Sequence, residues 1–176
     1  DEKGNKTAIS CRFIIDSSGN GRVLAKKLDL EAPPKIYDHF SIFTHLKEKS
    51  RPKGIEGEQI SFEIIDKETW FWYIPFSNGD SSLGFVGSNS WLKKYTGSTS
   101  EIFRLMLQET NYYKDRFNTY PFKFEPKVIE NISKNVKYTH GKGFALTGNS
   151  AEFLDPVFSS GVAFATESGL LAAKLA

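Results

Sequence analysis

Ser159, Ser160 and Gly161 stand where the sequence predicts the start of a helix. The segment that follows, 162–175, is rich in Ala and Leu, which are strong helix formers. The first backbone N–H groups of a helix have no partner within the helix, and the macrodipole is positive at this end. These three residues could therefore hold an anion or the electron-rich edge of a ring. An ordinary strand–turn–helix connection with a Ser cap would give the same pattern.

The residues before this helix start predict how the chain reaches it. Segment 143–147 is an apolar run that predicts a short buried strand. Gly148 follows it directly and would allow a ligand to approach the backbone closely. Asp155 and Pro156 then force a turn. We interpret Asp155 as a residue that fixes this turn through bonds to the backbone, and not as a catalytic carboxylate.

A second turn near the start of the sequence has a similar pattern. Residues 13–15 predict a buried strand, 16–21 form a turn cluster rich in Ser and Gly, and 22–28 predict a short helix. A strand, a Gly-containing turn and a helix make half of a nucleotide-binding unit. Because Asp-Ser-Ser-Gly is common in loops, this pattern alone is a weak signal.

The sharpest aromatic feature is the run Trp-Phe-Trp-Tyr-Ile-Pro that begins at Trp70. Alternate side chains of a strand share a face, so Trp70, Trp72 and Ile74 would line one side. Phe71 and Tyr73 would line the other. Aromatic surface on both faces would suit a strand between a bound ligand and a substrate cavity, where large flat side chains exclude water. An aromatic core strand of an antiparallel sheet is the alternative interpretation.

The middle of the sequence predicts an antiparallel sheet followed by a helix. Four segments have strand-like patterns: 36–46, 59–66, 69–76 and 82–88. Asn78-Gly79 is a strong hairpin signal between the last two. Ser98 or Ser100 can cap a helix over 98–117, and Glu101 enriches its first turn. Segments 127–134 and 136–139 predict strand that leads back towards the strand and turn of 143–161.

Composition excludes several classes of function. Of the 176 residues, 23 are basic and 21 are acidic. Because these numbers are nearly equal, the net charge gives no argument for a nucleic-acid partner. No apolar run approaches the ~20 residues that a membrane span needs. The single Cys11 excludes an intrachain disulfide and fits a reducing compartment, so we expect a cytoplasmic protein. His39 and His45 are too few for a zinc site, so no metal is expected.

Residues 148–162 resemble the second flavin-contacting motif of FAD-dependent monooxygenases and halogenases. That motif reads Gly-Asp-Ala-Ala-x-Phe-x-Asp-Pro-x-Phe-Ser-Ser-Gly-Val, and this chain has Gly-Asn-Ser-Ala-Glu-Phe-Leu-Asp-Pro-Val-Phe-Ser-Ser-Gly-Val. Asn149 replaces an Asp that bonds the ribityl chain of the flavin in the family, and Ser150 replaces an Ala. Asn keeps a hydrogen-bonding carbonyl but loses the charge, which predicts weaker or altered flavin binding.

Two further segments resemble the same family. The run at Trp70 fits Trp-x-Trp-x-Ile-Pro, the pattern that marks flavin-dependent halogenases, without a mismatch. The turn at Asp16 is similar to the Asp-Ala-Ser-Gly turn of large FAD-binding domains. The resemblance extends from Asp16 to Ala173. Phe158 stands where tryptophan halogenases have a Glu, which favours the branch that acts on phenols or pyrroles.

The resemblance implies FAD as the cofactor and O2-dependent oxidation of a halide or an aromatic substrate through a flavin hydroperoxide. It assigns cofactor contacts to residues of both turns: Asp16, Ser18, Gly19, Gly148, Asn149, Pro156, Ser159, Ser160, Gly161 and Val162. It assigns the halide to the backbone N–H groups of Ser160 and Gly161. The halogenase motif is Trp70, Trp72, Ile74 and Pro75. The implied partners are a small aromatic substrate, in some relatives tethered to a carrier protein, and a flavin reductase.

The expected fold class is α/β, or α+β within a fragment, with part of a Rossmann-like FAD-binding domain and an inserted antiparallel β-sheet domain for the substrate. The predicted boundaries are 1–31 and 128–176 for the FAD-binding parts and 32–127 for the substrate-binding sheet and helix. No Gly-x-Gly-x-x-Gly loop occurs, and no Lys can be assigned by motif as the family's residue that delivers hypohalous acid. The helical pattern continues up to Ala176, so we expect a C-terminal fragment. Because the loop and the Lys are both missing, we expect this fragment to be inactive alone.

Two other functions compete with the halogenase-like one. An FAD-dependent reductase of isoprenoid double bonds would share the fold and both flavin turns, although the full Trp-x-Trp-x-Ile-Pro pattern argues against it. The other hypothesis is a non-catalytic binding module on the same scaffold, and Asn149 is the residue that supports it.

Overall fold

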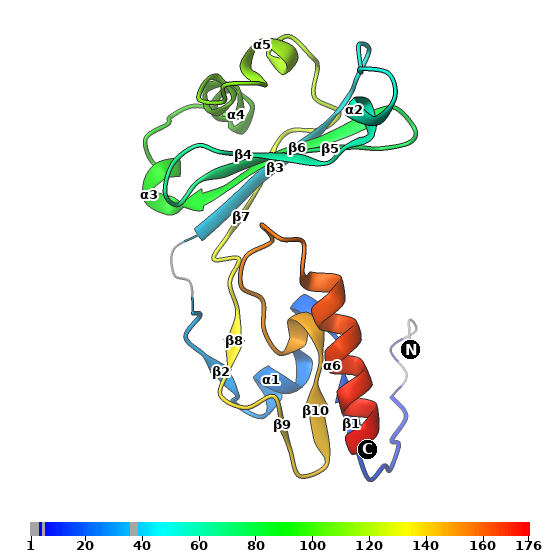
Figure 1. Ribbon diagram of the computed structural model, residues 1–176. Helices are drawn as coiled ribbons and strands as arrows, with labels where there is room; N and C mark the ends of the chain where they lie inside the picture. The colour runs from blue at the N-terminus through cyan, green and yellow to red at the C-terminus, as the bar shows by residue number, and fades with distance from the viewer. Residues whose placement is uncertain (1–3, 5, 36–38) are drawn as a thin grey trace. The chain divides into compact units, whose positions relative to one another are not determined.

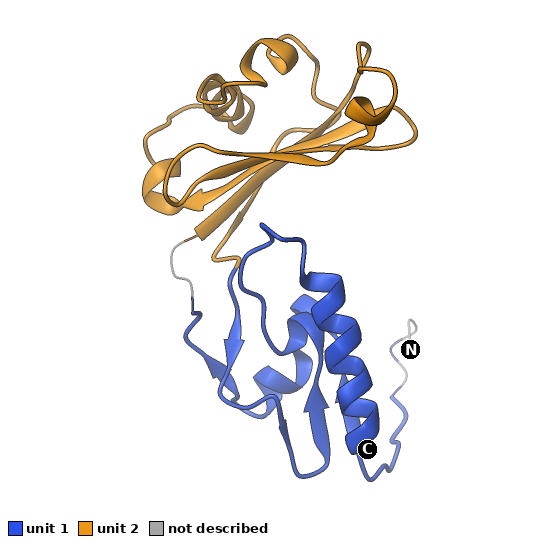
Figure 2. Ribbon diagram, viewed as in Figure 1, with its two compact units in different colours: residues 1–36, 133–176 blue, residues 37–132 orange. Residues whose placement is uncertain are grey.

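The chain folds into two compact units that interleave in the sequence. The computed structural model describes residues 4, 6–35 and 39–176. One unit contains residues 1–36 and 133–176, and the other contains residues 37–132 (Figure 2). The chain therefore enters the second unit once and returns to the first.

The first unit is built from short strands, two α-helices and two short 3-10 helices. Its described elements are β1 (Ile14–Asp16), η1 (Gly19–Gly21), α1 (Val23–Lys27), β2 (Glu31–Ala32), β8 (Asn135–Val136), β9 (His140–Gly141), β10 (Phe144–Leu146), η2 (Gly148–Ser150) and α6 (Gly161–Leu175) (Figure 1). β1 pairs in parallel with β10, which pairs antiparallel with β9. β2 and β8 form a separate antiparallel pair. The helix predicted to follow the turn 148–161 is confirmed as α6.

The strand predicted over 13–15 is confirmed in place as β1, but its predicted burial is wrong. Ile14 is 46% exposed and Ile15 is 39% exposed. The reason is that β1 lies at the edge of its sheet and pairs with β10 only, among the described residues. The small core of this unit instead gathers Ala25, Leu30, Val136, Leu146 and Ala151.

The second unit is an antiparallel sheet with helices. Its described elements are β3 (His39–Lys47), α2 (Ile55–Glu58), β4 (Ser61–Ile64), β5 (Trp70–Pro75), β6 (Asp80–Ser88), α3 (Asn89–Leu92), α4 (Thr99–Gln108), α5 (Lys114–Phe117) and β7 (Lys127–Glu130). The strand order is β4-β5-β6-β3-β7, with every pair antiparallel. The predicted Asn-Gly hairpin is confirmed: Gly79 has φ +83°, and the Phe76 N–H donates to the Asp80 carbonyl at 2.8 Å. Residues 36–38 of the predicted strand 36–46 lie outside the described residues.

One face of this sheet is covered by α4 and α5 (Figure 1). The core between them is aromatic because alternate residues of β3, β5 and β6 meet the helices. Its fully buried members include Phe40, Phe71, Phe85, Phe103, Met106 and Phe117. Ser98 caps α4 in a complete capping box with Glu101, which confirms the predicted helix start.

The predicted single helix over 98–117 is wrong, because the structure breaks it into α4 and α5. The carboxylate of Glu63 on β4 accepts hydrogen bonds from the backbone N–H groups of Asn111 and Tyr112. The Thr110 hydroxyl donates to the Leu107 carbonyl at 2.8 Å. These side chains satisfy backbone groups that a continuous helix would have used, so the helix stops.

Within the described part of the chain, no helix has the length and apolar character that a bilayer crossing needs.

Candidate functional site

The segment that the sequence singles out forms a compact turn between β10 and α6. Gly148 begins the 3-10 helix η2 with φ +53°, in the left-handed region that favours glycine. Its N–H donates to the Ser168 hydroxyl of α6 at 2.9 Å, and a Cβ at this position would lie 3.0 Å from the Cβ of Ala165. The close approach visible at Gly148 is therefore that of α6, which packs directly on η2.

The start of α6 is organised by the Asp-Pro turn. The Val157 N–H donates to Asp155 Oδ1 at 2.8 Å, which confirms Asp155 as a residue that fixes the turn. The Ser159 N–H donates to the Pro156 carbonyl at 2.8 Å, and Ser159 has φ +51°, an uncommon value for a residue other than glycine. Ser160 occupies the N-cap position, but its side chain accepts no hydrogen bond from the helix. The positive end of a 15-residue helix thus lacks a side-chain cap.

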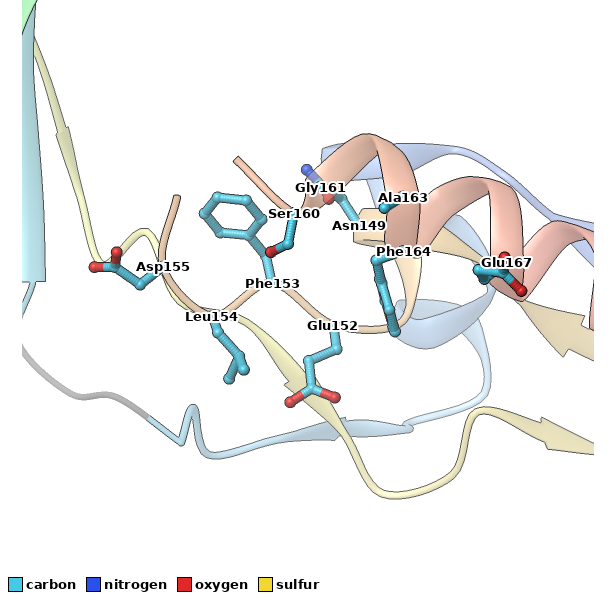
Figure 3. A pocket seen from close by; sticks show the side chains of 10 residues that line it. All are labelled: Asn149, Glu152, Phe153, Leu154, Asp155, Ser160, Gly161, Ala163, Phe164 and Glu167. Atoms are coloured by element: carbon cyan, nitrogen blue, oxygen red, sulfur yellow. The ribbon is translucent and has the colours of Figure 1, made fainter. Parts of the chain in front are cut away.

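A cavity of about 350 Å³ lies beside this helix start (Figure 3). Its wall combines apolar side chains with polar ones from η2, the Asp-Pro turn and α6: Asn149, Glu152, Phe153, Leu154, Asp155, Ser160, Gly161, Ala163, Phe164 and Glu167. Of the predicted cofactor-binding residues, Asn149, Ser160 and Gly161 line it. Gly148, Pro156 and Ser159 belong to the same turn and Val162 is in α6, but none of the four is in the wall.

The predicted turn at residues 16–21 is held mainly by its own side chains. The Asp16 carboxylate accepts hydrogen bonds of 2.7 Å from the N–H groups of Ser18 and Leu24, and the Ser18 hydroxyl accepts one of 2.9 Å from Val23. These bonds cap α1. Burial alone would raise the pKa of Asp16, but the hydrogen bonds from Ser18 and Leu24, with the charge of Arg22, lower it below its usual value. A cofactor contact from Asp16, Ser18 or Gly19 stays a prediction.

The structure brings the two predicted turns together, although about 130 residues separate them in the sequence. The Thr147 N–H donates to the Asp16 carbonyl at 3.0 Å, and the hydroxyls of Ser17 and Thr147 lie 2.9 Å apart. The Asn149 side-chain amide donates to the side chain of Asn20 at 3.3 Å. The two turns are therefore direct neighbours within the first unit.

Arg22 joins these turns, and the sequence analysis missed it. It is 3% exposed and has φ +51°. Its guanidinium donates to the carbonyls of Asn135 at 2.8 Å and Asn149 at 3.2 Å, and to the Glu31 carboxylate at 3.1 Å. Its only sequence signal is its position directly after the glycine-rich turn 16–21.

Comparison with known proteins relates the chain to a family of flavoenzymes. No protein-family model matches it. The 1H-pyrrole-2-carbonyl-[peptidyl-carrier protein] chlorinase of Pseudomonas fluorescens is 27% identical over 176 residues, which cover 93% of this chain and 38% of that protein. The tryptophan 2-halogenase of Chondromyces crocatus is 28% identical, with coverage of 97% and 33%. The crystal structure of halogenase PltM is 27% identical with a TM-score of 0.78, and covers 97% of this chain and 38% of that one.

The chain is a homologue of part of the flavin-dependent halogenases. It spans between a third and two fifths of the length of these relatives. A flavoprotein/dehydrogenase from Cytophaga hutchinsonii is also similar, with 44% identity and a TM-score of 0.91 over 99% of this chain and 43% of that one. The mixed α/β architecture with its antiparallel sheet therefore corresponds to part of the halogenase fold.

In this halogenase homologue the Trp-x-Trp-x-Ile-Pro run is strand β5, and its two faces differ. Phe71 and Tyr73 are 0% and 2% exposed in the core against α4 and α5. The expectation that this face borders a ligand or cavity is therefore wrong, because the helices occupy it. Trp70 and Trp72 lie on the opposite face with ring centroids 5.8 Å apart.

The sheet of the halogenase homologue holds Trp72 in a defined position. The Trp72 Nε1 donates to the Ser82 hydroxyl at 3.2 Å. A Cβ at Gly84 on β6 would lie 2.2 Å from the indole ring, so the ring lies directly on the glycine backbone. Gly84 and Ser82 are not part of the halogenase motif, and no sequence signal marks them.

Proposed function

We propose that this chain is the flavin-contacting and substrate-facing part of an FAD-dependent halogenase-like monooxygenase. The observation that carries the proposal is the start of α6. This helix end has no side-chain cap, lies in the segment that matches the flavin motif, and borders a cavity of about 350 Å³. Such a helix end favours an electron-rich or anionic group.

The residues at this cavity fit part of a flavin. Phe153 and Phe164 offer apolar surface to a flat ring, and the amide of Asn149 offers both a donor and an acceptor. In the proposed complex Asn149, Ser160 and Gly161 contact the cofactor directly. Gly148, Pro156, Ser159 and Val162 shape the turn, and the Asp16 turn, with Ser18 and Gly19, lies along the cofactor's polar chain. When bound, FAD would use O2 to oxidise a halide or an aromatic substrate.

The proposed halide contacts are the backbone N–H groups of Ser160 and Gly161. Gly161 opens α6, and the first bond within the helix runs from the Phe164 N–H to the Ser160 carbonyl at 2.9 Å. The N–H groups before Phe164 are those that a helix leaves without an intrahelical partner. We assign no catalytic side chain within this chain, because no Lys of the family's delivery motif occurs in it.

The second unit is proposed as the substrate-binding part, with Trp70, Trp72, Ile74 and Pro75 as the halogenase motif. Its substrate would be a small aromatic compound, and a flavin reductase would supply reducing equivalents. Presentation by a carrier protein is proposed because the name of the Pseudomonas relative includes a carrier-linked substrate. The proposed location is the cytoplasm.

A second candidate function is an FAD-dependent reductase or dehydrogenase without halogenation. The observation in its favour is the 44% identity to a protein described as a flavoprotein/dehydrogenase. Asn149 in place of the family's Asp supports a related alternative, a binding module that lacks catalysis.

The test uses the full-length gene product. FAD binding is measured by fluorescence titration, and turnover is measured with reduced FAD, O2 and chloride or bromide. We expect FAD binding and consumption of halide. A protein that binds FAD but consumes no halide would support the reductase, and a protein that fails to bind FAD would support the non-catalytic module.

A further inference from the structure

One histidine of the second unit lies on the same face of the sheet as the tryptophans of the halogenase motif. His45 of β3 is paired with Ser82 of β6, and Ser82 is paired in turn with Ile74 of β5. Direct partners in a sheet point to the same face, so His45 shares the face of Ile74 and Trp72, opposite to α4 and α5 (Figure 1). These residues all belong to the second unit.

The His45 ring lies between two phenylalanine rings. Its centroid is 5.3 Å from that of Phe76 and 5.0 Å from that of Phe124, and both contacts are edge-to-face, with interplanar angles of 82° and 63°. Phe43, the preceding residue of β3 on this face, contacts Phe124 with ring centroids 6.2 Å apart. All four residues are partly buried and retain accessible surface. The face therefore offers apolar surface to a flat aromatic ligand, with one polar ring in its midst.

The ring nitrogens of His45 have unused hydrogen-bonding capacity. Among the described residues, none forms a hydrogen bond with either nitrogen, and neither nitrogen is enclosed as a buried atom. The Ser82 hydroxyl on the neighbouring strand already accepts the hydrogen bond from Trp72 Nε1 at 3.2 Å. A ligand on this face can therefore reach a nitrogen of His45 without displacing a partner within the protein.

The charged groups near His45 leave its ring neutral at pH 7. Burial lowers the pKa of His45 below its usual 6.5, and the charge of Asp80, which raises it, is opposed by that of Lys123. Asp80 is itself paired with the ammonium groups of Lys123 at 2.6 Å and Lys47 at 3.8 Å. A neutral imidazole has one nitrogen that accepts a hydrogen bond, and here that acceptor lies among aromatic rings.

We propose that His45 is a substrate-binding residue, and that its ring accepts a hydrogen bond from a hydroxyl or N–H group carried by an aromatic ring. The inference rests on the proposed function and deepens it, because it names the group of the aromatic substrate that is recognised. Phe43, Phe76 and Phe124 contact the substrate ring, and His45 fixes its orientation. A variant without this acceptor leaves the donor of the substrate unpaired, which lowers affinity for that substrate specifically.

The experiment measures equilibrium binding, without turnover, of resorcinol and 1,3-dimethoxybenzene to the full-length protein. The two compounds share a ring, but methylation removes both donors from the second. His45→Phe keeps an aromatic ring between Phe76 and Phe124 and has no acceptor. It should weaken the binding of resorcinol by about 10-fold and change that of 1,3-dimethoxybenzene by less than about 2-fold.

Two further variants make the test specific. His45→Gln keeps a neutral acceptor and should retain the resorcinol affinity of the wild type to within about 3-fold. His140→Phe is the matched control, because His140 is an exposed histidine of β9 in the first unit, and it should bind both compounds like the wild type. Thermal unfolding checks that each variant is folded.

The inference is overturned if His45→Phe binds resorcinol like the wild type, if it weakens both compounds equally, or if the wild type binds neither. A wild type that binds no FAD would instead refute the proposed function, and the comparison of the two compounds would still decide the role of His45.

Discussion

The Tyr73 hydroxyl of β5 donates a hydrogen bond of 2.8 Å to Glu48, whose side chain is 1% exposed. Glu48 directly follows β3, so this bond ties the strand of the halogenase motif to a neighbouring part of the same sheet. The carboxylate also accepts hydrogen bonds from Arg116 of α5 at 2.9 Å, Ser81 of β6 at 2.8 Å and Arg51 at 3.1 Å. Arg116 in turn lies over the Tyr73 ring, 4.8 Å from its centroid. One buried carboxylate thus joins three strands and a helix beneath the motif.

We expect Glu48→Gln to destabilise the second unit by about 3 kcal/mol, because it leaves two arginines beside a neutral amide in a buried site. Urea unfolding monitored by tryptophan fluorescence measures the change, since Trp70, Trp72 and Trp91 all lie in this unit. Glu130→Gln, an exposed site on β7, is the control and should change stability by less than about 0.5 kcal/mol. Equal stability of the two variants would show that the buried network contributes nothing.

The same carboxylate predicts a dependence of stability on pH. Burial alone would raise the pKa of Glu48, but the hydrogen bonds from Arg116, Ser81, Tyr73 and Arg51 lower it below its usual 4.5. A lowered pKa in the folded state means that the stabilisation is complete above 4.5 and is lost as the pH falls through the folded value. The difference in unfolding free energy between the wild type and Glu48→Gln should therefore be constant from pH 7 to 5.5 and shrink below pH 4.5. A difference that stays constant down to pH 3 would contradict this assignment.

Gly84→Ala should displace the indole ring of Trp72. The added Cβ would lie 2.2 Å from the ring, far inside contact distance, so the ring must rotate and lose its hydrogen bond to Ser82. Overpacking of this kind costs about 1–3 kcal/mol. The specific readout is the near-ultraviolet circular dichroism of the tryptophans, which should change at a temperature where the variant is folded. Gly169→Ala is the control, because nothing lies within 4 Å of its added Cβ, and it should leave the spectrum unchanged.

Local signals in the sequence were sufficient where a few neighbouring residues decide the structure. The helix start at Ser98, the Asn-Gly hairpin and the Asp155 turn each depend on contacts within a few positions, and each was predicted correctly. The motif also located the turn at α6, since it restricts the residue type at most of its 15 positions.

The wrong prediction of a single helix and the missed Arg22 have a different cause, which is a contact made over a long sequence distance. The helix ends at Gln108 because the Glu63 carboxylate accepts the hydrogen bond of the Asn111 N–H, and these two residues are 48 positions apart. Arg22 joins the two turns because its guanidinium donates to the carbonyls of Asn135 and Asn149, which lie more than 100 residues later in the sequence. Single-sequence periodicity contains no information on such partners, so neither the helix break nor the buried arginine could be derived from it.

Arg22→Lys should destabilise the first unit by about 2–3 kcal/mol, although it keeps the charge. The guanidinium reaches the carbonyls of Asn135 and Asn149 and the Glu31 carboxylate together, and a single ammonium group cannot reproduce that fork. Hydrogen exchange should show faster opening of the amides of α1 and η2, while those of β3 and β6 in the second unit keep their protection. Lys26→Arg, at an exposed position of α1, is the control and should leave exchange unchanged. Unaltered protection of α1 in Arg22→Lys would mean that the guanidinium bonds do not hold the two turns together.

Gly148→Ala should weaken the contact between η2 and α6 for two separable reasons. The backbone has φ +53°, which an Ala adopts at a cost of about 1 kcal/mol or more, and the new Cβ would lie 3.0 Å from the Cβ of Ala165. We expect a total loss of about 2 kcal/mol in thermal or urea unfolding. The double variant Gly148→Ala with Ala165→Gly removes the steric part but leaves the backbone strain. Its loss of stability should therefore equal the loss in Ala165→Gly plus the cost of the strain, to within about 0.5 kcal/mol. If the double variant instead loses as much stability as the two single variants added together, or more, the close contact of Gly148 with α6 is not what restricts this position.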